Sequence, residues 1–98
     1  MAQIEILSEC ELPAAWRFDA QVLDDAGALR KHVLTLSWAD YNLWSQDGSD
    51  EPARVADAVL NFLLMRGGAD VIPAKLDASR ARRLHADADR VIPTLIGR

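Results

Sequence analysis

The stretch Lys31–Trp44, KHVLTLSWADYNLW, changes from one structural period to another within a few residues. Its first half, VLTL, alternates β-branched and leucine side chains, and this period of two predicts a strand. Ser37 then precedes Asp40 by three residues, close to a capping box, in which a side-chain oxygen accepts a free amide at a helix start. We therefore expect a strand to end, and a short helix to begin, at Ser37.

Two further strands are expected before this stretch. Residues 4–12, IEILSECEL, alternate apolar side chains with glutamates, and Pro13 closes the segment. Residues 16–22 repeat the alternation. The turn signal DDAG at 24–27 follows them, and the short connection to the third strand favours an antiparallel hairpin. In the first strand the alternation places Cys10 with the apolar residues, so we expect it to be buried.

The second half of the sequence predicts helices. Pro52 has its backbone preset for a first helical turn, and the apolar run that follows it ends at Gly67 and Gly68. We expect residues 70–76 to form an extended link and Asp77 to cap a last helix. The apolar residues that recur at helical spacing in this last helix are Ala81, Leu84 and Ala88. Pro93 makes VIPTLI a separate turn or a bent tail.

These elements predict the fold class. Ninety-eight residues suffice for one domain, which would bury roughly 60–65% of its unfolded surface. Strands followed by helices indicate an α+β domain over residues 1–98. We expect a small antiparallel three-stranded sheet, followed by two or three helices packed on one of its faces.

The same succession resembles a group of small uncharacterised bacterial α+β proteins. The resemblance rests on "VLTLSWADYNLW" with its S-x-A-D-Y turn, on "EPARVADAVLNFLLMR" with its F-L-L-x-R helix end, and on "VIPAKLD" and "RVIPTLI". It covers roughly residues 14–97, mostly at core, cap and turn positions. Because the group has no assigned activity, the resemblance implies the fold rather than the function.

Composition excludes some classes of function and favours others. The single cysteine allows no internal disulfide, and no apolar run approaches the ~20 residues of a membrane span, so we expect a cytoplasmic protein. The net charge of −4 disfavours general binding to nucleic acid. Residues 1–74 carry a net charge of −7 and residues 75–98 a net charge of +3. This asymmetry favours either a charged partner or a contact within the chain, in which the basic end lies against the acidic remainder.

Sequence motifs for catalysis are weak, and we expect no enzymatic activity, cofactor or metal. The alternative is a small ligand- or metal-binding protein or enzyme that uses His85 and Asp89, one helical turn apart, with His32 as the remaining histidine. A second alternative is a nucleic-acid-associated regulator that binds through a face formed by Arg80 and Arg83.

The aromatic residues suggest an interaction surface. Three large rings, Trp38, Tyr41 and Trp44, share one broad face of the short helix and are either core or interface. We expect Trp38 and Leu43 to belong to the core. We therefore expect a protein–protein interaction module. Its candidate interface comprises Trp38, Tyr41, Trp44, Arg80 and Arg83, and a homodimer is one form that it could take.

Overall fold

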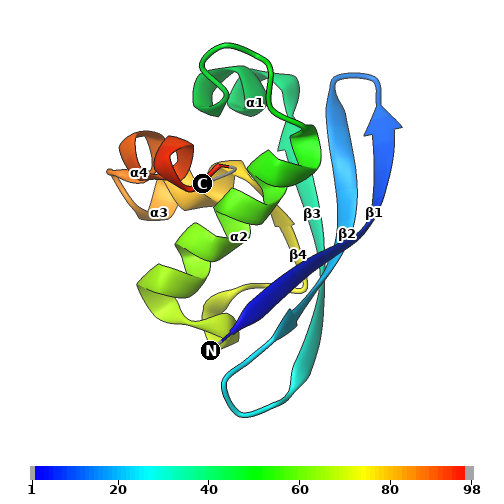
Figure 1. The fold of residues 1–98 in the computed structure, drawn as a ribbon, viewed down its shortest axis with the longest axis vertical. Coiled ribbons are helices and arrows are strands. Elements are labelled where there is room, and N and C mark those ends of the chain that lie inside the picture. Colours follow the sequence, from blue (N-terminus) through cyan, green and yellow to red (C-terminus); the bar gives the residue numbers. More distant parts are fainter. Residues whose placement is uncertain (1, 97–98) are drawn as a thin grey trace.

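A computed structural model of the protein describes residues 2–96. Four strands form one mixed sheet in the order β1-β2-β3-β4 (Figure 1). Their bounds are Gln3–Leu12 for β1, Ala15–Leu23 for β2, Leu29–Ser37 for β3 and Lys75–Asp77 for β4. The first three strands form the expected antiparallel meander, and β4 is added to it in parallel with β3.

The helices gather on one side of this sheet and leave its other face open (Figure 1). They are α1 (Trp38–Trp44), α2 (Pro52–Gly67), the short 3₁₀ helix η1 (Ala69–Val71), α3 (Ser79–Leu84) and α4 (Ala88–Leu95). The α+β class is therefore confirmed. The prediction of three strands and two or three helices was wrong in detail, because the described chain has four strands and four α-helices.

The added strand is β4, which lies where we expected only an extended link. It has three residues, and only Leu76 of them is buried. A segment this short contains too few residues to show a periodicity. Leu76 pairs with Leu34 of β3, which lies far earlier in the sequence. The residues next to Leu76 in the sequence therefore do not encode this pairing.

The expected last helix is divided into two. The chain leaves the helical conformation at His85, and α4 begins at Ala88 on a different axis (Figure 1). Asp77 accepts the backbone amide of Ser79 at 2.9 Å, but the N-cap residue of α3 is Ala78 rather than the expected Asp77. Pro93 lies inside α4, so the expectation of a turn or bent tail there was wrong.

The core lies between α2 and the inner face of the sheet. Seven residues of α2 are buried, and all lie in the apolar run that the sequence assigns to this helix: Val55, Ala56, Ala58, Val59, Leu60, Phe62 and Leu63. They pack with Phe18, Leu34 and Leu36 of the sheet in a single cluster. No helix within residues 2–96 is long and apolar enough to cross a membrane.

One irregularity changes the orientation of half of β1. The antiparallel register between β1 and β2 shifts between Ile6 and Ser8, as a β-bulge does. Beyond the shift, Cys10 lies opposite Arg17 on the open face, and its side chain is exposed. The expectation of a buried Cys10 was wrong, because one extra residue reverses the alternation for the rest of the strand.

Candidate functional site

The aromatic helix α1 begins as the sequence predicts. The Ser37 hydroxyl accepts the amide of Asp40 at 3.1 Å and satisfies one of the free donors of the first turn. The three rings then differ in environment. Trp44 is 1% exposed, Tyr41 is half-buried, and Trp38 is 46% exposed. The aromatic face of α1 therefore runs from the core to the surface.

These positions correct part of the expected interface. Trp44 is a core residue and has almost no surface to offer a partner. Trp38 and Leu43, which we expected in the core, are both exposed. A helix of seven residues has only two turns, and its buried residues, Asp40 and Trp44, contact side chains of α3 and α4.

Trp44 belongs to a polar cluster that joins three helices. Its indole Nε1 donates to Asp89 of α4 at 2.8 Å, and the Arg82 guanidinium of α3 lies 5.7 Å from its ring centroid. Arg82 also donates to Asp40 of α1 and, through Nε at 3.2 Å, to Asp89. Burial opposes the charge of Arg82, but the two carboxylates outweigh burial and raise the pKa of the guanidinium.

In this cluster, part of the basic C-terminal region pairs with part of the acidic remainder of the chain. The acidic aromatic helix and the basic helix α3 meet within one chain, through Arg82. Arg80 and Arg83 lie on the other side of α3, and neither has a carboxylate partner among residues 2–96. Of the two arginines, Arg83 is exposed and Arg80 is half-buried.

His85 and Asp89 do not form the ligand pair that a continuous helix would have brought together. His85 ends α3 and packs edge-on against Phe62, with ring centroids 5.5 Å apart. Asp89 is directed to Trp44 and Arg82. Within residues 2–96, no group of three or more His, Cys, Asp or Glu side chains is placed to hold a metal ion.

His32 has a separate structural environment. It is buried, and its Nδ1 lies 2.7 Å from the carbonyl oxygen of Pro73, which requires the proton to be on Nδ1. Its Nε2 is buried without a hydrogen-bond partner in the described chain. His32 thus joins β3 to the segment before β4 and lies apart from His85.

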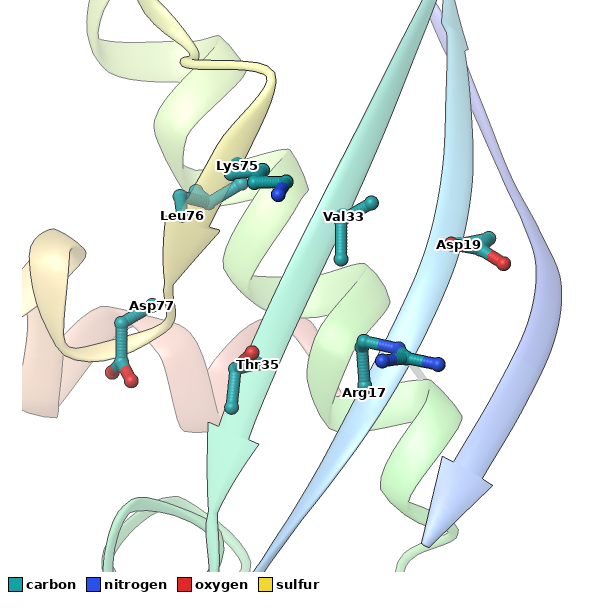
Figure 2. Close-up of a pocket in the computed structure, with 7 residues that line it drawn as sticks. All are labelled: Arg17, Asp19, Val33, Thr35, Lys75, Leu76 and Asp77. Atoms are coloured by element: carbon teal, nitrogen blue, oxygen red, sulfur yellow. The ribbon is translucent and has the colours of Figure 1, made fainter. Parts of the chain in front are cut away.

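A hollow of about 540 Å³ lies on the open face of the sheet. Figure 2 shows that its polar side chains do not converge: Arg17 extends toward β1, Lys75 extends toward Val33, and Asp77 points away from β3. Asp19 accepts the Ser8 hydroxyl at 2.8 Å. Sites of catalysis and tight small-molecule binding typically direct several polar groups at one point, and these side chains are not arranged in that way.

A smaller hollow, which we call the α2–α3 groove, has a different character. Its volume is about 290 Å³, and it is lined by Leu63, Arg66, Gly67, Val71, Arg80, Leu84 and His85. Val71 is 56% exposed and Leu84 is 54% exposed, although both are large aliphatic side chains. Arg66 lies over the Phe62 ring at 4.9 Å and pairs with Asp87, whose pKa the Arg66 hydrogen bond lowers. Arg80 is therefore the cation of this groove that remains without a carboxylate.

The sequence pointed to Arg80 but missed its apolar neighbours. Leu84 has helical spacing with Ala81, but α3 ends at Leu84, and the Leu84 side chain is 54% exposed. Val71 is positioned by a close approach to the end of α2. A Cβ added at Gly67 would lie 2.5 Å from Val71 Cγ2, so only glycine fits there without a shift. The Gly67-Gly68 pair was the available signal.

Comparison with protein-family models, with curated proteins and with solved structures gave no match. The fold and the surfaces described above therefore define this chain only as a small α+β domain. Its resemblance to a group of small bacterial proteins stays a prediction. The function is argued below from its own residues.

Proposed function

We propose that this chain is a non-enzymatic protein–protein interaction module that binds an apolar, acidic segment of a partner in the α2–α3 groove. The observation that supports the proposal most directly is the pair Val71 and Leu84. Both side chains are more than half exposed beside the same hollow. Apolar side chains grouped around a concavity are typical of a surface that another protein covers.

The charge of the partner follows from the arginines. Arg80 lines the groove, Arg83 lies one helical turn from it on α3, and both lack a carboxylate within residues 2–96. Burying an unpaired guanidinium under a neutral partner would be unfavourable, whereas carboxylates on the partner would form charge-assisted hydrogen bonds with it. A partner segment with one or two aliphatic side chains flanked by Asp or Glu fits both features.

The arginines also decide which form of self-association is favourable. A two-fold dimer that buried α3 against α3 would place Arg80 and Arg83 close to their own copies. Like charges across an interface are destabilising, so this surface favours a different, acidic surface as its partner. A second copy could offer such a surface only in a head-to-tail contact. The cytoplasmic location expected from the sequence is part of this proposal.

Site-specific photocrosslinking tests the proposal in cells that express the protein. A photoreactive phenylalanine derivative replaces Leu84 in one variant and Leu43, an exposed leucine of α1, in a matched control. We expect an adduct from position 84 and none from position 43. Peptide sequencing of the adduct should show aliphatic residues flanked by Asp or Glu, and its mass shows whether the partner is a second 10.8 kDa chain.

The charge requirement is tested by combining Arg80→Glu and Arg83→Glu with the photoreactive group at position 84. Neither arginine forms an ion pair in the described chain, so we expect the melting temperature to be retained and the adduct to be lost. Equal adducts from positions 43 and 84, or an adduct that survives the charge reversal, would show that the proposal is wrong.

A further inference from the structure

A second exposed surface lies where the end of the β1–β2 hairpin stands beside α1 (Figure 1). Trp16 of β2 contacts both aromatic residues at the outer end of α1. Its ring centroid lies 6.2 Å from that of Trp38 and 5.2 Å from that of Tyr41, with tilted planes in both pairs. Trp16 is half-buried, and Trp38 remains 46% exposed, so two indole rings reach the surface side by side.

The third ring is held in place by its hydroxyl group. Tyr41 donates to the backbone carbonyls of Asp50 and Gly48, which ties α1 to the loop before α2. These hydrogen bonds hold the cluster in place, and the backbone amide of Trp38 donates to the Ala14 carbonyl at 3.0 Å. The indole of Trp38 itself forms no hydrogen bond within residues 2–96 and stays free to contact a partner. Rigid aromatic side chains lose little conformational entropy when a partner binds, and binding surfaces are therefore rich in them.

The bulge in β1 turns two carboxylates to the face of the sheet that carries Trp16. After the register shift, Glu11 lies opposite Trp16 and Glu9 lies opposite Phe18. Residues directly opposite each other in an antiparallel pair point to the same face, with Cβ atoms about 4.5–5.5 Å apart. Without the bulge, both glutamates would face away from the rings. Both are exposed, and neither forms an ion pair within residues 2–96.

We infer that this surface, formed by Trp16, Trp38, Glu9 and Glu11, binds an arginine- or lysine-bearing segment of a protein. A guanidinium placed over an exposed indole face gains a cation–π contact, and an adjacent carboxylate can accept its hydrogen bonds. The same carboxylates repel phosphates, which disfavours nucleic acid on these rings. The partner's charge is opposite to the one that the α2–α3 groove requires. The two surfaces share no residue, so this inference stands independently of the proposed function.

The test uses the full chain and a short peptide of alternating arginine and glycine. The matched peptide carries citrulline, which keeps the shape of arginine and removes its charge. Indole N–H signals of the ¹⁵N-labelled protein report the contact, assigned with single Trp→Phe variants. We expect the arginine peptide to shift the Trp16 and Trp38 signals. The Trp44 signal should stay fixed, because that indole is buried and bonded to Asp89.

Variants identify which groups bind the peptide. Trp38→Ala should weaken binding about two- to fivefold, the range of one exposed cation–π contact. Glu11→Gln should also weaken it and make it less sensitive to salt. The matched control is Glu5→Gln, a glutamate of the same strand before the bulge that bonds to Gln21. Equal binding of the citrulline peptide, equal effects of Glu5→Gln and Glu11→Gln, or no shift at millimolar peptide would overturn the inference.

Discussion

Removing the Arg82 guanidinium tests the polar cluster that holds α1, α3 and α4 together. The informative change is Arg82→Met, which keeps most of the aliphatic stem that packs toward Trp44 and removes the charge. In the folded protein Asp40 is only 5% exposed, and Arg82 is its ion-pair partner. The substitution therefore leaves a carboxylate buried without its cation.

The expected loss can be bounded from burial. Breaking a fully buried ion pair by removing one partner costs about 3–5 kcal/mol. The Arg82 side chain is 38% exposed, so water already screens part of its interaction, and the loss should fall to about 2–3 kcal/mol. This is a large share of the 5–15 kcal/mol by which a domain of this size is typically stable.

Urea unfolding at pH 7, followed by far-ultraviolet circular dichroism, measures this loss. The double variant Arg82→Met with Asp40→Asn removes the buried charge as well, and we expect it to recover more than half of the lost stability. Asp40→Asn alone should cost less than Arg82→Met, because the partly exposed Arg82 cation keeps Asp89 as an ion-pair partner. The reasoning is refuted if Arg82→Met costs less than about 0.5 kcal/mol, the range of an ordinary surface change, or if the double variant is no more stable than Arg82→Met.

Two further predictions concern pH and the β1 bulge. Burial raises the pKa of Asp57 above its usual 3.8, so the folded state favours the protonated carboxyl, and stability falls as pH rises through that raised pKa. Asp57→Asn, which can still accept the Asn61 amide, should therefore raise the melting temperature at pH 7 but not at pH 3; a lower melting temperature at pH 7 would contradict this. The exposed thiol of Cys10 should react with a disulfide reagent in native buffer at a rate close to that in urea, whereas strong native-state protection would place Cys10 in the core.

Local sequence patterns predicted the elements whose cause is local. The Ser37 cap, the alternation of β2 and β3, and the apolar face of α2 each depend on residues within a few positions of one another. The strand β4 does not, because its pairing partner on β3 lies some forty residues earlier in the chain. The division between α3 and α4 likewise results from packing, since Arg82 and Asp89 are both drawn toward α1.

The candidate site was predictable in its residue types but not in its arrangement. The sequence identified α1 and the arginines of α3, and it suggested that opposite charges might meet. It could not show that, among residues 2–96, Arg82 makes this contact while Arg80 has no carboxylate partner. The bulge does have a sign in the sequence, because two apolar residues, Ile6 and Leu7, and then two polar ones interrupt the alternation of IEILSECEL where the ladder shifts.

The order of elements along the chain has a consequence for synthesis on the ribosome. The meander of β1, β2 and β3 emerges first, but the helix that covers its apolar face, α2, ends only at Gly67. At roughly 5–20 residues per second, Phe18, Leu34 and Leu36 are made some seconds before that cover exists. During this interval the nascent sheet has an uncovered face and a long free edge, β1. The glutamates and the bulge of β1 discourage pairing between neighbouring nascent chains at that edge.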